Sequence, residues 1–149
     1  MSNVAHTTTL GRPKDLAKRQ AILIAAKELF LQLGYEGSSM DAIAQEAGVS
    51  KLTVYNHFQD KENLFTAAIE HHADNLLPPL DFDLKADMSI ETALFNIAVR
   101  FQHMIYSKEG LELHRLMCSM TQQNPALVHN FFKAGPARVL SHMTRLLEQ

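Results

Sequence analysis

Apolar residues recur along most of the chain at the three-to-four-residue spacing of amphipathic α-helices. The first such stripe predicts a helix that ends at Gly34 and comprises Ile22, Ala26, Leu29, Phe30 and Leu33. The most regular stripe runs through residues 90–105 and predicts a long helix. Alternating runs of β-branched residues are missing from the sequence, so the pattern predicts an all-α fold.

Short polar signals place the next helices. Residues 38–41, Ser-Ser-Met-Asp, have the form of a capping box and predict a short helix that ends before Gly48. Ser50 is expected to cap a third helix that continues to Phe58. The sequence therefore predicts two short helices joined by a turn.

Further breaks divide the rest of the chain. A fourth helix is predicted from an Asp60 cap to the Pro78-Pro79 pair, where the missing backbone donor ends it. Gly110 is expected to separate the helix over residues 90–105 from a sixth helix. Asn124-Pro125 predicts the start of a seventh helix, and Gly135-Pro136 predicts a kink within it.

Residues 40–59 carry the pattern of a helix-turn-helix. Ala44 supplies a small contact residue, Gly48 a flexible turn and Val54 an apolar anchor, as two steeply crossed helices require. Six residues are left to point outward, all of them polar except Leu52: Lys51, Leu52, Thr53, Tyr55, Asn56 and His57. Such a second helix enters the major groove of DNA, which makes these residues the candidate binding face.

Charge is unevenly distributed, although the net charge is only -2 and the pI is near 6.4. The first twenty residues hold one acid, Asp15, against Arg12, Lys14, Lys18 and Arg19. Residues 70–91 hold six acids against a single basic residue, Lys85. A basic front and an acidic body suit a protein whose N-terminal part meets phosphates.

The cysteine content and the absence of long apolar runs indicate the cellular compartment. Cys118 is the one cysteine, so no intrachain disulfide is possible and a reducing compartment is expected. The sequence has no apolar run near the ~20 residues that span a bilayer, and its first residues lack the apolar core of a signal peptide. These features predict a cytoplasmic protein with no membrane partner.

Residues 21–65, AILIAAKELFLQLGYEGSSMDAIAQEAGVSKLTVYNHFQDKENLF, resemble the DNA-binding domain of the TetR family of transcriptional regulators. The likeness covers about residues 16–77. It implies a homodimer that reads a palindromic operator and a C-terminal helical domain that binds a small molecule and dimerises. Residues 124–147, NPALVHNFFKAGPARVLSHMTRLL, resemble the AefR-like sensor domains more weakly.

The resemblance implies a division of the chain into three parts. Residues 1–14 form a flexible basic arm that could enter a minor groove, and residues 15–62 form the helix-turn-helix domain. Residues 63–149 form a helical regulatory domain that stops before the family's last dimerisation helices. Apolar helix faces would then lack a partner, and dimerisation of these 149 residues would be in doubt.

Carried over position by position, the resemblance also implies roles for single residues. It puts Lys51, Leu52 and Thr53 nearest the bases, although the family often has a smaller residue at the position of Leu52. It directs Tyr55, His57, Lys61 and Ser39 toward phosphates, leaves either role to Asn56, and assigns Arg12 and Lys14 to the basic arm. No cofactor is implied.

Each position also has a plainer interpretation. Tyr55 could pack between helices, and Lys61 could be a solvated surface charge. Asn56 and His57 lack the carboxylate or nucleophile partners of a catalytic site, so no catalytic residue is predicted. The histidines lack the spacing of metal ligands, so no metal site is predicted.

A ligand pocket is expected among the later helices because soft and aromatic side chains gather there. The candidates are Phe101, His103, Met104, His114, Met117 and Phe131, each of which could equally be ordinary core. Two alternatives to a ligand-responsive repressor remain open: a helical enzyme, and a protein-interaction module that binds no DNA.

Overall fold

The protein, described by a computed structural model, has defined positions for residues 11–76 and 88–148. These residues form helices only, which confirms the all-α prediction. Their bounds are α1 Gly11–Gly37, α2 Met40–Glu46, α3 Lys51–Phe58, α4 Lys61–Leu76, α5 Ile90–Tyr106, α6 Lys108–Met120, α7 Pro125–Ala134 and α8 Pro136–Leu147. The predicted Pro78-Pro79 break lies outside the described residues.

Helix α1 forms the base on which α2, α3 and α4 pack. Its predicted stripe is largely confirmed, because Ile22, Ala26 and Phe30 are fully buried. Gly34 leaves the helical region with φ 76°, as a chain stop requires, although helical turns resume to Gly37. Leu33 was expected in the core and is 54% exposed, since the stripe turns outward one residue before this kink.

The start of α2 differs from the predicted capping box. Ser39, not Ser38, is the N-cap, and its hydroxyl oxygen accepts a hydrogen bond of 3.1 Å from the Ala42 amide. Ser38 is buried and donates to the Gly34 carbonyl oxygen at 2.8 Å, which ties the kink of α1 to the start of α2. The predicted Ser50 cap of α3 is confirmed, because its hydroxyl oxygen accepts from the Thr53 amide at 3.2 Å.

The boundary predicted at Gly110 was wrong. Helix α6 begins at Lys108, because the hydroxyl oxygen of Ser107 accepts from the Gly110 amide at 3.0 Å and caps the helix one turn earlier. Gly110 instead permits close packing, since a Cβ atom there would collide with the carbonyl oxygen of Met104. The predicted kink at Gly135-Pro136 is a full break between α7 and α8.

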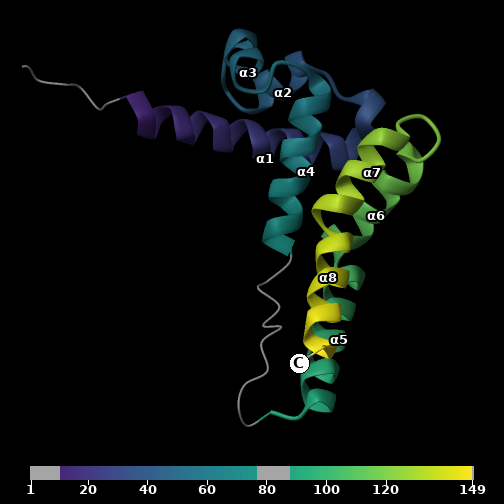
Figure 1. Cartoon of the computed structure of the whole chain (residues 1–149). Helices are drawn as coiled ribbons and strands as arrows, with labels where there is room; N and C mark the ends of the chain where they lie inside the picture. Colours follow the sequence, from purple (N-terminus) through teal and green to yellow (C-terminus); the bar gives the residue numbers. More distant parts are fainter. Residues whose placement is uncertain (1–10, 77–87, 149) are drawn as a thin grey trace, which may run out of the picture.

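The helices form two parts that share α4 (Figure 1). Helices α2 and α3 lie on one side of α1, and α4 runs away from them past α1 toward α7. Helices α5 to α8 continue in that direction, with α5 and α8 running in opposite senses. Because α4 is continuous over Lys61–Leu76, it crosses the predicted boundary between residues 62 and 63 and joins the two parts.

Candidate nucleic-acid interface and ligand cavity

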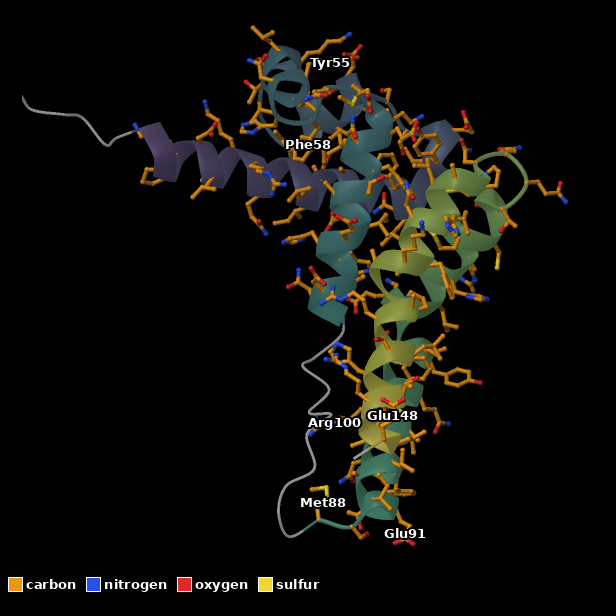
Figure 2. All side chains as sticks on the ribbon, viewed as in Figure 1. Tyr55, Phe58, Met88, Glu91, Arg100 and Glu148 are labelled. Carbon is orange, nitrogen blue, oxygen red and sulfur yellow. The ribbon has the colours of Figure 1, made fainter. Side chains whose placement is uncertain are left out.

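Helix α3 is fixed on the core by its inner face. Val54 is fully buried and Phe58 is 5% exposed, while Ala44 of α2 is buried beside them. Gly48 makes the turn between the helices with φ 66°, a conformation that glycine adopts without strain. The positions predicted for a helix-turn-helix therefore have the predicted burial. Figure 2 shows Phe58 directed toward α1 and Tyr55 on the opposite side of α3.

The other side of α3 faces solvent and carries most of the predicted binding residues. We call Lys51, Leu52, Thr53, Tyr55 and Asn56 the outer face of α3. Leu52 is 70% exposed and Tyr55 39% exposed, and Lys51 and Asn56 are also exposed. Thr53 is half-buried, and its hydroxyl oxygen lies 2.8 Å from that of Ser50. A rigid helix thus presents donors, acceptors and a methyl-bearing side chain together, as base recognition requires.

Lys51 is held at the start of this face by an acidic neighbour. Its ammonium lies 2.7 Å from the Asp41 carboxylate of α2. The hydrogen bond that the ammonium donates to Asp41, and then the charge of Asp41, raise the pKa of Lys51 above its ordinary value, so the ammonium stays charged at neutral pH. Both side chains are more than half exposed, so a DNA phosphate or base can compete for the ammonium in water.

Three residues predicted to face phosphates have other contacts in the structure. The His57 ring is 14% exposed, and its Nε2 lies 3.1 Å from the Asp15 carboxylate of α1. The Lys61 ammonium lies 4.3 Å from the centre of the Tyr35 ring, a cation–π contact. The Ser39 hydroxyl caps α2 but remains exposed and keeps its own proton to donate.

The predicted flexible arm is wrong for its last four residues. Gly11 to Lys14 form the first turn of α1, where Pro13 is tolerated because the first amides of a helix have no partner to lose. Lys14 is exposed on this turn. Arg12 is part of the helix, and residues 1–10 of the arm lie outside the described residues.

A cavity of about 430 Å³ lies between α4 and the last four helices. Its walls include five of the six predicted ligand-binding residues: Phe101, Met104, His114, Met117 and Phe131. His103 is not among the lining residues and is exposed. The volume falls within the range typical of small-molecule sites.

The remaining wall was not predicted from the sequence. It consists of Ala73, Ile105, Gly110, Leu113, Gly135, Pro136, Val139 and Leu140. Two signals could have found part of it. Leu113 lies four residues before Met117, so both share one face of α6. The break at Gly135-Pro136 lets α8 change direction and close the cavity.

Polar groups are sparse in and around this region. Among the described residues of the cavity wall, His114 is the one titratable side chain, and its Nε2 lies 3.6 Å from the Cys118 sulfur. His72 of α4 is 6% exposed, and its Nε2 has no hydrogen-bond partner among the described residues. Burial, and then the charge of Lys27, lower the pKa of His72 below its ordinary value.

The described parts of the chain hold neither a candidate metal site nor a candidate membrane span. Within residues 11–76 and 88–148, no group of three or more His, Cys, Asp or Glu side chains is placed to hold a metal ion. In the same segments no helix has both the length and the apolar character needed to cross a bilayer.

Comparison with protein families matches both parts of the chain. The model for bacterial regulatory proteins of the tetR family matches residues 22–68. The model for the C-terminal domain of AefR-like transcriptional repressors matches residues 92–149. Among curated proteins, the transcriptional activator FasR of Mycolicibacterium smegmatis is 46% identical over 65 residues, which are 44% of this chain. The chain spans only 29% of the length of FasR.

Solved structures share the fold over most of the chain. A TetR-family transcriptional regulator from Mesorhizobium loti superposes with a TM-score of 0.77 and 29% identity, covering 91% of this chain and 68% of that one. The flavonoid-responsive regulator FrrA gives a TM-score of 0.75 and 31% identity, with 88% and 66% covered. With two family models that together match most of its residues, and with this shared fold, the chain belongs to the TetR family of transcriptional regulators.

Proposed function

We propose that this chain represses transcription by binding an operator through the outer face of α3 and releases it when a small apolar molecule fills the cavity. The observation that carries the proposal is the burial pattern of α3. Val54 and Phe58 lock the helix to the core, while Lys51, Leu52 and Tyr55 of the same helix are exposed. A helix held in this way can be inserted into a major groove without losing its support.

On the outer face each side chain has a role that fits its chemistry. Lys51 and Thr53 donate hydrogen bonds to base edges, and Leu52 packs against a thymine methyl group. Asn56 matches the edge of an adenine or a phosphate. Tyr55, Ser39 and Lys61 donate to phosphates, which fixes the register of the helix on the duplex.

A second copy of the protein would give the operator its symmetry. Two copies related by a two-fold axis place their α3 helices in successive major grooves, about 34 Å apart. The operator is then an inverted repeat. The AefR-like match over α5 to α8 supports repression as the sign of control, whereas FasR is named an activator.

The path from ligand to DNA runs through α4. Ala73 near the end of this helix lines the cavity, and Lys61 at its start is separated from the end of α3 by only Gln59 and Asp60. A ligand that fits the cavity better in one position of α4 shifts the population toward that position. The two reading helices of the dimer then no longer match successive grooves, and the DNA is released.

The DNA part is tested by selecting bound sequences from random duplexes with the purified chain. We expect an enriched inverted repeat whose binding weakens as salt increases. A protein-interaction module predicts no enriched sequence and no salt-dependent binding, and that result would exclude the proposal.

The ligand part needs a separate measurement. A panel of apolar compounds is screened for those that raise the melting temperature and release the selected duplex. A Leu140→Trp change narrows the cavity at a residue that is 60% exposed, so the fold should tolerate it. We expect this variant to bind DNA normally and to lose the response. A duplex that stays bound throughout a broad panel would count against a sensor.

A further inference from the structure

The first turns of α1 extend past the helical bundle (Figure 1), and the side chains of residues 13–20 are all exposed. Two contacts nevertheless join this segment to the recognition helix. The Asp15 carboxylate lies 3.1 Å from the His57 ring, and the Arg19 guanidinium lies 5.3 Å from the centre of the Phe58 ring. Both partners belong to the last turn of α3.

The spacing of these residues orients α1. Asp15 and Arg19 are four residues apart, so they share the face of α1 that meets α3. Gln20, on a neighbouring face, hydrogen-bonds the ring of His71 in α4 at 2.9 Å and marks the side toward the regulatory part. Lys18 is two residues before Gln20, which places it roughly opposite on a helix of 3.6 residues per turn.

Lys14 lies on the same side as Lys18. The two lysines are four residues apart, both are exposed, and they project from the side of α1 that faces away from α4. Asp15 and Arg19, each one residue after a lysine, contact the last turn of α3, so the two lysines lie near that end of α3. A duplex bound by α3 would therefore bring its phosphates close to them.

We propose that the start of α1 is a second DNA-contacting element, in which Lys14 and Lys18 bind backbone phosphates beside the groove that α3 enters. His57 acts as a positioning residue that holds this element through Asp15. The inference rests on the proposed function, and for residues 11–14 it replaces a flexible minor-groove arm by a helix. An α-helix is about 10 Å wide with its side chains, too wide for a minor groove of about 6 Å.

The role of His57 follows from its surroundings. A ring that is 14% exposed, and whose Nε2 already meets Asp15, is poorly placed to reach a phosphate. Its neighbour Phe58 is anchored in the core, so the last turn of α3 is a fixed support for α1. Asp15, the single acid among the first twenty residues, is the side chain that this imidazole holds.

The test measures binding of the selected duplex at several salt concentrations. Each phosphate contact contributes about 0.9 to the slope of log K against log salt, so Lys14→Ala/Lys18→Ala should reduce the slope by about 1.8. The matched control is Lys108→Ala/Lys133→Ala, which removes two exposed lysines of α6 and α7 and should leave the slope unchanged. Equal slopes for the wild type and the first variant would overturn the proposal.

His57→Ala separates positioning from direct contact. If His57 only positions α1, His57→Ala lowers the slope of log K against log salt in the otherwise unchanged protein. In the Lys14→Ala/Lys18→Ala variant it causes no further decrease. An equal decrease in both backgrounds would mean that His57 binds a phosphate itself and would overturn the assigned role. Melting temperatures confirm that every variant is folded. If no duplex is selected at all, the proposed function fails, whereas a bound duplex with an unchanged slope refutes this inference alone.

Discussion

The ammonium of Lys51, the first residue of α3, lies 2.7 Å from the carboxylate of Asp41 in α2. The pair spans the turn of the helix-turn-helix and places a negative charge beside the proposed reading surface. If Lys51 contacts DNA as proposed, the duplex must replace a carboxylate that already binds the lysine. Asp41 would then set how readily Lys51 is released to the duplex.

Replacing Asp41 by Asn should strengthen operator binding, because Lys51 no longer exchanges one anionic partner for another. The same substitution in a Lys51→Ala background should give a smaller gain, since only the general loss of negative charge remains. Fluorescence anisotropy with the selected duplex measures both. Equal gains in the two backgrounds would show that the pair does not compete with DNA.

The Tyr55 hydroxyl should contribute to binding and not to folding. Tyr55→Phe keeps the ring, which is 39% exposed, and removes the group proposed to donate to a phosphate. We expect affinity for the operator to fall by about 1 to 2 kcal/mol, the scale of a hydrogen bond to a charged group. Tyr106→Phe, at an exposed tyrosine of α5, is the control and should change neither affinity nor melting temperature.

His72 should make the protein less stable in mild acid. Burial lowers the pKa of its ring in the folded state, so the unfolded chain takes up the proton first, near its ordinary pKa of about 6.5. Stability is thus complete above that pH and is lost as the pH falls from there toward the folded-state pKa. His72→Leu should reduce this loss and add about 1 kcal/mol at neutral pH by removing an unpaired buried nitrogen.

Urea unfolding at pH values on either side of about 6.5 checks this prediction. His129→Leu, at an exposed position of α7, is the control and should keep the pH dependence of the wild type. If His72→Leu shows the same acid sensitivity as the wild type, another group is responsible.

Any side chain larger than that of Gly110 should destabilise the junction of α5 and α6. Gly110→Ala places a methyl group against the carbonyl oxygens of Met104 and Ile105, which belong to the backbone and cannot turn aside. We expect a loss of about 1 to 3 kcal/mol in the free energy of unfolding. Gly135→Ala is a matched control, because its Cβ atom would meet one oxygen at 3.7 Å, an ordinary contact. Similar losses for both variants would contradict the explanation.

The sequence predicted the order of the helices because apolar periodicity and capping residues are local signals. Ser50 and Gly48 acted as expected, since each is used by its own turn. The errors at Ser38 and Gly110 arose where two local signals compete. Ser38 donates to the Gly34 carbonyl oxygen four residues earlier, which leaves Ser39 as the cap of α2. The Ser107 cap starts α6 before Gly110 is reached.

The proposed DNA-binding surface was predictable where it depends on the periodicity of α3 alone. The exposure of Lys51, Leu52, Tyr55 and Asn56 follows from their position around a helix whose inner residues are Val54 and Phe58. The contact between His57 and Asp15 was not predictable, because the two residues are 42 positions apart in sequence. They meet only because α1 packs against the last turn of α3. The cavity wall from α8 was missed for the same reason.

The most direct test of the central claim compares the selected duplex with a scrambled one for the wild type and for Lys51→Ala/Asn56→Ala. The outer face of α3 is proposed to read the sequence, so we expect the wild type to prefer the selected duplex by at least about 1,000-fold. The double variant should bind both duplexes with nearly equal affinity while keeping the wild-type melting temperature. A folded double variant that retains the full preference would contradict the account.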